Sequence, residues 1–283
     1  MSNIKDIGKR IKSIKNTQKV THAMELVAAA KMRKSQATAL AGRPYSISLS
    51  EVMNEVKNKS RTSKHPLLKS NDSEKQMIIL ISSDRGLAGG LNINLFREIA
   101  KSEIKNTQFI TVGKKATEFS SKTNQNLLAS YNSEEKSALD LARILTKMAT
   151  DAFIKKEVSK VSILYSHFDS TIKQTPKWVS LLPIEIGLNP NIPTTQQPNN
   201  LIFEPSGDEI LESILPHHIL TQIYQVLVES KASEFSARMV AMKNATDAAG
   251  DLVDDLTLTY NQARQEAITK ELLDIVTAQK AFE

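Results

Sequence analysis

The chain has 283 residues, of which 40% are hydrophobic and 24% are charged, a balance typical of a folded protein and not of a disordered one. Only 5% are aromatic, which favours extended helices rich in Ala, Leu and Ile over one large globular core. The absence of cysteine excludes disulfides, thiolate metal sites and cysteine nucleophiles. The basic N-terminus lacks the apolar core of a signal peptide and no run of about 18 apolar residues occurs, so we expect membrane contact only through partners.

Charge is distributed unequally between the two ends of the chain. Residues 1–64 hold fourteen Lys and Arg against four Asp and Glu, whereas residues 208–283 hold six against thirteen. The overall net charge of +6 could suggest nucleic acid, but an arm that binds nucleic acid should be free of its own protein's acidic surface. The simpler interpretation is that the two ends lie alongside each other, and we expect no nucleic-acid partner.

Residues 1–60 are predicted to form one long helix. No proline precedes Pro44, and a proline in a helix interior would cost about 3 kcal/mol. The apolar residues at the three-and-four spacing of a coiled coil are Ile4, Ile7, Ile11 and Ile14. Downstream, an apolar stripe continues with a shifted phase through Val20, Met24 and Val27.

Residues 207–283 are predicted to form a second helix. The residues of its expected seam, spaced by fours and threes, are Ile219, Ile223, Val226, Ser230, Ser233, Ala237 and Val240. The small residues among them would let a partner helix come close. Ala248, Leu252 and Leu256 then follow at a spacing of four, which predicts a slip in phase. Pro216 is expected to kink or restart the helix, after a short helix at about 207–215.

The predicted length of the second helix requires a partner. At about 1.5 Å per residue, residues 216–281 would span roughly 100 Å, far more than a helix of an ordinary globular protein. Such a helix must be covered along most of its face. The natural partner is the N-terminal helix, and the two would run antiparallel because a middle domain joins them.

Residues 73–205 are predicted to form a small Rossmann-like α/β domain, which makes the chain a mixed α+β and α/β protein. Met77–Ile81 is a continuous apolar run typical of a buried parallel strand, and the turn Ser82–Asn92 leads from it into a helix at about Leu91–Lys101. Residues 189–200 read as a surface loop. The remaining predicted elements are strands at Gln108–Val112, Val161–Tyr165 and Trp178–Ile186, and a helix at about Ser133–Lys156.

The glycines of the first turn raise the possibility of a nucleotide site. Gly86, Gly89 and Gly90 lie between a strand and a helix, where phosphate-binding loops occur. Their spacing fits neither G-x-G-x-x-G nor G-x-x-x-x-G-K-[ST], and no Lys follows Gly90. A structural tight turn is therefore favoured over phosphate binding.

The histidines and charged clusters do not predict a metal or catalytic site. Adjacent histidines on a helix, as at His217 and His218, point about 100° apart and chelate one ion poorly. The other three histidines are isolated in the sequence, and they are His22, His65 and His167. The aspartates at positions 251, 254 and 255 could supply paired catalytic carboxylates, but on a long exposed helix such a cluster is usually a solvated or ion-paired face. The basic tract Lys31–Lys34 could pair with acidic loops of a partner.

Three segments of the sequence resemble the gamma subunit of bacterial F-type ATP synthases. They are Ile14–Lys34 (IKNTQKVTHAMELVAAAKMRK), Ser83–Asn94 (SDRGLAGGLNIN), and Ser233–Asp274 with its ARMVAMKNAT and YNQARQEAITKELLD runs. These segments stand in the family's order and cover both ends of the chain and the first strand and turn. The chain departs from the family at Ala88, where Cys is frequent, and at Thr277–Lys280, where a Gly is usual.

The resemblance implies a non-catalytic rotor shaft. Such a subunit turns inside the hexamer of alpha and beta subunits and couples proton flow across a membrane to ATP synthesis or hydrolysis. It implies no cofactor in this chain, because ATP, ADP and Mg belong to the alpha and beta subunits. Further implied partners are the epsilon subunit and the membrane c-ring, on the cytoplasmic side of the bacterial inner membrane.

The resemblance also assigns contact residues. Contacts with the catalytic subunits fall on Met24, Arg264, Gln265, Thr269 and Glu271, and contacts with the ring or the epsilon subunit fall on Phe203 and Glu204. Since the second helix is the longer one, its residues from about 264 onward should lack a partner helix and need a surrounding socket. Other interpretations of the sequence are a non-rotary coiled-coil tether, a nucleotide-dependent enzyme and a nucleic-acid binder.

Overall fold

The computed structural model describes residues 2–59, 65–102, 106–184 and 207–281 of the chain. Two long helices, α1 (Ser2–Lys59) and α5 (Gly207–Ala281), lie at the two ends of the sequence. The elements between them are η2 (Pro66–Leu68), β1 (Gln76–Ile81), α2 (Leu91–Lys101), β2 (Thr107–Val112), α3 (Lys114–Lys122), β3 (Asn126–Tyr131), α4 (Ala138–Ile154), β4 (Lys160–Phe168) and β5 (Gln174–Leu182). The chain divides into two compact units, residues 30–237 and residues 1–29 with 238–283.

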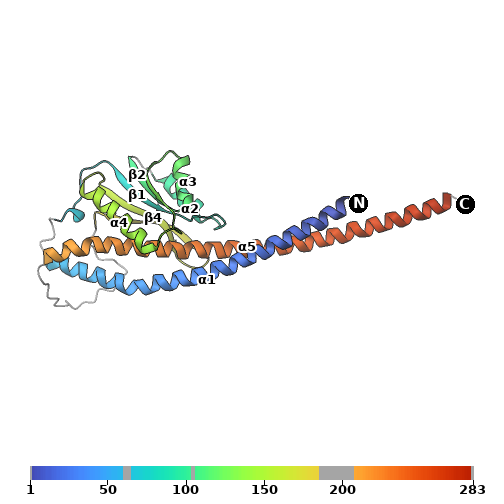
Figure 1. The fold of residues 1–283 in the computed structure, drawn as a ribbon, viewed down its shortest axis with the longest axis horizontal. Helices are drawn as coiled ribbons and strands as arrows, with labels where there is room; N and C mark the ends of the chain where they lie inside the picture. The colour runs from blue at the N-terminus through green and yellow to red at the C-terminus, as the bar shows by residue number, and fades with distance from the viewer. Residues whose placement is uncertain (1, 60–64, 103–105, 185–206, 282–283) are drawn as a thin grey trace. The chain divides into compact units, whose positions relative to one another are not determined.

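The first unit, residues 30–237, is called the sheet unit because it is built on a five-stranded sheet (Figure 1). The strand order of the sheet is β3-β2-β1-β4-β5. The pairs of β1 with β2, β1 with β4 and β2 with β3 are parallel, whereas β5 runs antiparallel to β4. β1 is the central strand, and Met77–Ile81 are all buried. The prediction of a buried parallel strand here is confirmed, because side chains of both faces are covered by helices.

The two faces of the sheet carry separate cores. Met77, Ile79 and Ile81 point to the face covered by α4 and by residues 211–227 of α5. Ile78 and Leu80 point to the opposite face, which α2 and α3 cover. This alternation along one strand is the period of two expected for a strand between two helical layers.

Three elements of the sheet unit escaped the sequence analysis, namely α3, β3 and the short η2. β3 is an edge strand whose side chains alternate between exposed and half-buried, so it lacks the apolar run that marks β1. α3 has nine residues, and only Ala116 and Ser120 are buried in it. α4 begins at Ala138 and not near Ser133, because the Ser137 side chain caps it by accepting a hydrogen bond from the Asp140 N–H.

In the sheet unit, α1 and α5 lie side by side and antiparallel (Figure 1). The Gln225 side-chain amide donates to the carbonyl of Ala39 at 3.0 Å. The ring of His217, eight residues earlier in α5, contacts the ring of Tyr45, six residues later in α1. The two helices therefore run in opposite directions. Ile219, Ile223 and Val226, the first residues of the predicted seam, lie in the core that α5 shares with the sheet, α4 and Met53 of α1.

The expectation of a separate short helix before Pro216 is wrong. α5 is continuous from Gly207 through Pro216, as α1 is through Pro44. Leu211, Leu215 and Ile219 are buried on one face of α5 before and after the proline. Their packing on the core offsets the backbone hydrogen bond that the proline removes.

In the second unit, residues 2–29 of α1 run antiparallel to residues 238–281 of α5. A Cβ at Gly8 would lie 3.6 Å from the Tyr260 ring, and farther along α1 the hydroxyl groups of Thr21 and Thr246 are 2.8 Å apart. The predicted N-terminal seam lies on the covered side of α1. Its four residues are half-buried, whereas their neighbours on the outer face are exposed; they are Ile4, Ile7, Ile11 and Ile14.

The predicted phase slip in α5 is wrong, because Ala248 and Leu252 are exposed. The covered positions keep a spacing of three and four, and they are Ala249, Val253, Leu256, Tyr260, Ala263 and Ala267. Apolar character misled the prediction here, since small or polar residues occupy the seam near Ala249 of α5 and Gln18 of α1. The Gln18 side chain, for example, reaches the Thr246 carbonyl and would lie 3.1 Å from a Cβ at Gly250.

Opposite charge does not hold the two helices of this unit together. The aspartates of α5 at positions 247, 251, 254 and 255 are exposed, and in the described part of the chain they form no ion pair with the lysines of α1 between residues 5 and 19. Exposed ion pairs stabilise a protein by only about 0–1 kcal/mol. Side-chain packing and hydrogen bonds in the seam therefore pair the helices.

Gly113 cannot accept a side chain unless the neighbouring backbone moves. Its φ is +98°, and a Cβ there would lie 2.3 Å from the Ser82 carbonyl oxygen. We expect Gly113→Ala to lower the free energy of unfolding of the sheet unit by about 3 kcal/mol or more, since both backbone strain and a backbone clash are introduced. Urea denaturation followed by the fluorescence of Trp178, the single tryptophan, measures this change.

Gly86→Ala is the matched control, because a Cβ at Gly86 would meet nothing within 4 Å. It should change stability by less than about 1 kcal/mol. Equal stability of the two variants would contradict the account of Gly113.

Candidate functional site

The carboxyl edge of the sheet is where a ligand site would be expected in this kind of fold. The chain steps outward from β1 to β2 and β3, and then returns to the other side of β1 for β4. In open α/β sheets ligands bind in the crevice where this reversal occurs, outside the carboxyl ends of the strands. Here that crevice lies between the segments that follow β1 and β4.

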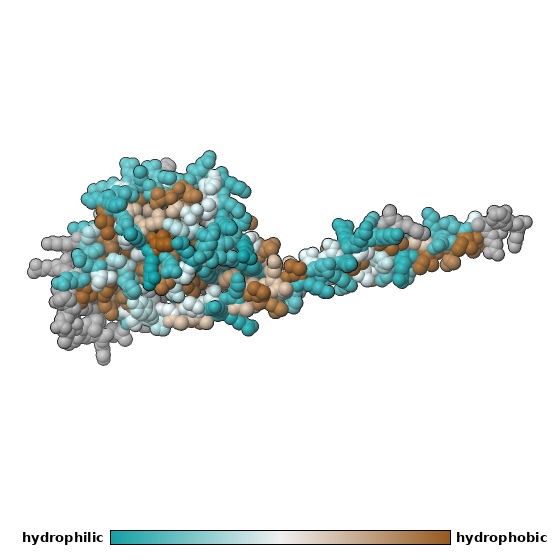
Figure 2. All heavy atoms as spheres, in the orientation of Figure 1, coloured by the Kyte–Doolittle hydropathy of each residue, from teal (hydrophilic) through white to brown (hydrophobic). Residues whose placement is uncertain are grey.

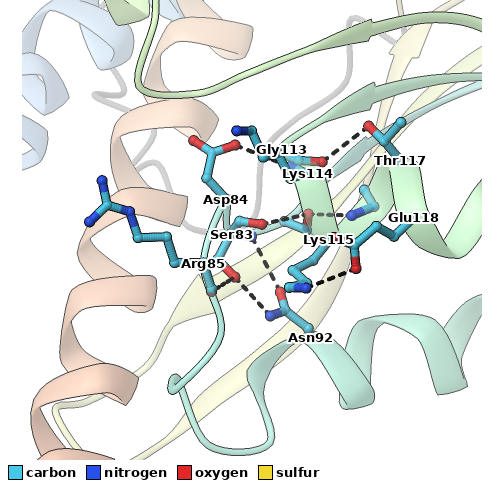
Figure 3. A network of polar contacts seen from close by, with 11 residues as sticks. Ser83, Asp84, Arg85, Asn92, Gly113, Lys114, Lys115, Thr117 and Glu118 are labelled. Atoms are coloured by element: carbon cyan, nitrogen blue, oxygen red, sulfur yellow. Dashed lines mark hydrogen bonds and ion pairs between the residues drawn. The ribbon is translucent and has the colours of Figure 1, made fainter.

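The N-terminus of α3 is closed by the segment that follows β1 (Figure 3). The Lys114 N–H donates to the Asp84 carboxylate at 3.1 Å, and the Lys115 N–H donates to the Ser83 carbonyl at 3.2 Å. The Ala116 N–H donates to the Ser82 hydroxyl at 2.7 Å. A phosphate binds at a helix N-terminus by accepting hydrogen bonds from free backbone N–H groups. These three N–H groups of α3 already donate to atoms of the chain itself.

Asp84 acts as an internal anion at this edge. It is 8% exposed, and its second carboxylate oxygen accepts a hydrogen bond from the Glu134 N–H at 3.1 Å. The carboxylate thereby joins the N-terminus of α3 to the turn that follows β3. A side chain of the protein holds the position that a ligand's negative charge would otherwise take.

The glycine-containing segment between β1 and α2 is a tight turn, as its spacing predicted. Leu87 and Gly89 have φ values of +62° and +57°, and the turn closes with the Leu91 N–H donating to the Ala88 carbonyl. Asn92 fixes the start of α2 by donating to the Ser83 hydroxyl at 2.7 Å and accepting from the Ser83 N–H.

Helix α5 lies across the crevice between β1 and β4. Glu229 accepts a hydrogen bond from Tyr165 of β4, and the Lys231 ammonium donates to the Ser133 carbonyl at 3.0 Å. Two turns farther on, Ala237 packs against Ala88 and Leu91 of the β1–α2 segment. The small residues of α5 were expected to admit a partner helix; Ala237 instead admits this segment of the sheet unit.

The histidines of the sheet unit have local structural roles. His65 caps η2 by accepting from the Leu67 N–H, and burial lowers its pKa although the nearby Glu212 charge opposes this. Burial is also the larger cause that lowers the pKa of His218, with the neighbouring His217 second. Over the described residues, no three His, Cys, Asp or Glu side chains converge as metal ligands would.

The exposed apolar residues of α1 form the first candidate partner surface. Val20, Met24 and Val27 are 55%, 43% and 56% exposed, so the apolar stripe that they form faces solvent and is not part of the covered seam. Thr21 and Ala28 occupy the covered side of the helix at this level. Met24 therefore presents an uncharged side chain to solvent, where a partner subunit can reach it.

The basic tract Lys31–Lys34 is mostly solvent-facing. Lys31, Arg33 and Lys34 are exposed, whereas Met32 is buried. The Lys31 ammonium lies 5.3 Å from the centre of the Phe235 ring, within the range of a cation–π contact.

The end of α5 forms the second candidate surface (Figures 1 and 2). All residues from Ile268 to Thr277 are exposed, and α5 runs on beyond the start of α1. The apolar members of this surface, between 50% and 60% exposed, are Ile268, Leu272, Leu273, Ile275 and Val276. The predicted contact residues here, which are also exposed, are Arg264, Gln265, Thr269 and Glu271.

The remaining predicted contacts, Phe203 and Glu204, lie outside the described residues. No helix in the described ranges is long and apolar enough to cross a membrane.

Comparison with known proteins gives a consistent result over the whole chain. The family model described as ATP synthase matches residues 3–282. The ATP synthase gamma chain of Methylacidiphilum infernorum is 40% identical, with all of both chains covered. That of Opitutus terrae is 37% identical, with 99% of both chains covered.

Solved structures share the fold. A chain of the mitochondrial ATP synthase of Euglena gracilis, in an assembly of OSCP, F1 and c-ring, has a TM-score of 0.72 at 18% identity, with 99% of this chain and 95% of that chain covered. A chain of the central stalk and c-ring of the Tetrahymena thermophila mitochondrial ATP synthase has a TM-score of 0.63 at 24% identity, with 80% and 99% covered.

Removal of the Asp84 carboxylate should leave two part-buried backbone N–H groups, those of Lys114 and Glu134, without their acceptor. We expect Asp84→Ala to destabilise the sheet unit by about 2–4 kcal/mol. Asp84→Asn, which keeps one carbonyl oxygen as an acceptor, should lower the free energy of unfolding by about half as much as Asp84→Ala. Urea denaturation followed by Trp178 fluorescence measures both changes, and an Asp84→Ala variant as stable as the unmodified chain would contradict the role given to this carboxylate.

Proposed function

This chain belongs to the ATP synthase gamma-chain family and is a central-stalk subunit of that complex; on this premise we propose that its paired helices turn inside a hexamer of alpha and beta subunits and couple proton flow to ATP turnover. The matched relatives are gamma chains along their full length. The alternative of a non-rotary coiled-coil tether is not supported by these comparisons.

The observation that carries the proposal is the exposed end of α5. A single helix of this kind frays in water unless something covers it. At about 100° per residue its apolar residues fall within an arc of about 160°, so they cover one side of the helix and suit a socket with an apolar wall facing that side. Such a socket would be an apolar collar at the end of the hexamer, with Ile268, Leu272, Leu273, Ile275 and Val276 inside it.

The polar residues of this surface suit contacts that are made and broken. Arg264, Gln265, Thr269 and Glu271 are exposed, and the Thr269 hydroxyl donates to the Gln265 carbonyl of its own helix. We place these four against the catalytic subunits. Met24 is placed there as well, since an exposed uncharged side chain lets a charged loop slide past without forming an ion pair that must break at each step.

The chain is proposed to be non-catalytic, with ATP, ADP and Mg bound by the alpha and beta subunits. The arrangement of the sheet unit supports this. Asp84 and the segment Ser82–Ser83 fill the N-terminus of α3, and α5 lies across the crevice where this kind of fold binds its ligands. The position of a nucleotide is thus occupied by parts of the chain itself.

The proposed partners beyond the hexamer are the epsilon subunit and the c-ring. The proposed location is the cytoplasmic side of the bacterial inner membrane, with attachment through the complex. Support comes from the bacterial relatives and from a fold shared with chains of central-stalk and c-ring assemblies.

Truncation of α5 tests the socket. The chain is expressed with the other subunits of the complex, and the alpha and beta subunits that copurify with it are measured together with ATP hydrolysis. Deletion of residues 277–283 should leave both largely intact, because most of the apolar surface remains. Deletion of residues 262–283 should reduce both severalfold, because the whole exposed end is removed.

The controls are the unmodified chain and the isolated full-length chain, which should show no ATP hydrolysis of its own. Loss of assembly on removal of the last seven residues, or full assembly after the larger deletion, would contradict the socket.

A further inference from the structure

Glu229 is an unusual residue in the contact between α5 and the sheet. Before it, α5 meets the core with apolar side chains such as Leu215, Ile219 and Ile223, each of which is fully buried. Glu229 is charged, yet its side chain is only 13% exposed. A carboxylate removed from water costs several kcal/mol unless it is paired, so its partners should matter.

Both oxygens of the Glu229 carboxylate are bonded to the end of β4. One lies 2.7 Å from His167 Nδ1, and the other accepts a hydrogen bond from the Tyr165 hydroxyl at 2.9 Å. Burial, followed by the charge of Glu229, raises the pKa of Tyr165, so the hydroxyl keeps its proton and remains a donor. Asp169 faces the other nitrogen of His167 at 3.7 Å.

Two further polar contacts attach the same stretch of α5 to the sheet unit. The Ser236 hydroxyl donates to the Thr171 carbonyl at 2.7 Å, in the turn between β4 and β5. Lys231 reaches the Ser133 carbonyl in the turn after β3. The polar contacts of residues 229–236 thus reach three separate places along the carboxyl edge of the sheet.

Polar and apolar contacts restrain a helix differently. Apolar burial is non-directional and scales with area, so a helix held by it alone can shift or rotate at small cost. A carboxylate bonded at both oxygens to donors on a strand fixes position and rotation together, because charge-assisted hydrogen bonds depend on distance and direction.

We propose that Glu229, with Tyr165 and His167, forms a clamp that fixes the rotation and register of α5 on the sheet. The three residues are positioning residues. In the assembly of the proposed function, the clamp transmits torque between α5 and the α/β sheet unit without slip, and this part of the inference rests on the proposed function.

Hydrogen exchange in the isolated full-length chain tests the clamp itself. Glu229→Gln keeps the shape of the side chain and removes its charge, and Tyr165→Phe removes one donor. Each variant should accelerate amide exchange in residues 165–174 about tenfold or more, as expected for the loss of a hydrogen bond to a charged group. The double variant should exceed the larger single effect only slightly, because the residues act as one unit.

Asp247→Asn is the matched control, since Asp247 is an exposed carboxylate on the same helix, and it should leave exchange in residues 165–174 unchanged. Unchanged exchange in Glu229→Gln, or fully additive effects in the double variant, would overturn the clamp.

The assembled complex in inverted membrane vesicles tests the transmission of torque. The ratio of ATP-driven proton pumping to ATP hydrolysis should fall at least about twofold in Glu229→Gln, with hydrolysis retained, and should stay at the unmodified value in Asp247→Asn. Accelerated exchange with an unchanged ratio would overturn the torque role. An unmodified complex that does not couple pumping to hydrolysis would contradict the proposed function, while the exchange result would still decide the clamp.

Discussion

The pairing of α1 with α5 is the interaction on which the rest of the structure depends. Neither helix can be stable alone in water over its whole length, because most helical stability in proteins comes from packing of one face. Small residues permit the close approach: a Cβ at Gly42 would lie 2.9 Å from the Gln225 amide oxygen, and Gly8 lies against Tyr260. Hydrogen bonds such as that between Thr21 and Thr246 then fix the register of one helix along the other. Burial of apolar surface alone does not fix this register, because it is non-directional.

The sheet unit shows how a ligand-binding architecture can hold a helix. Its strand order creates the crevice that binds ligands in related folds, and α5 lies where the ligand would lie. Asp84 supplies the negative charge that the N-terminus of α3 favours. The same features that orient a nucleotide in an enzyme, namely directional donors and a fixed helix N-terminus, here orient parts of the chain itself.

The sequence predicted the elements that have a local apolar pattern, but not the features that depend on contacts between distant residues. The apolar run Met77–Ile81 and the spacing of Ile4 to Ile14 carry their own signal, so the central strand and the long helices were found. Spacing alone did not show that the stripe of Val20, Met24 and Val27 faces away from the partner helix, because the covered side of α1 at that level holds Thr21 and Ala28, which give little apolar signal. The contacts of Asp84 and Glu229 join residues 30 or more positions apart, which no spacing rule reveals.

A disulfide across the helical pair tests the central claim most directly. Because the chain has no cysteine, Thr21→Cys with Thr246→Cys introduces one possible bond at a place where the two hydroxyl oxygens are 2.8 Å apart. The account predicts rapid oxidation to the crosslinked chain, and ATP hydrolysis by the assembled complex that continues after crosslinking, since both helices turn together. The control pair, Thr21→Cys with Thr257→Cys, should not crosslink, because Thr257 is about 16 Å farther along α5. No crosslink in the first pair, or hydrolysis abolished by it, would contradict the account.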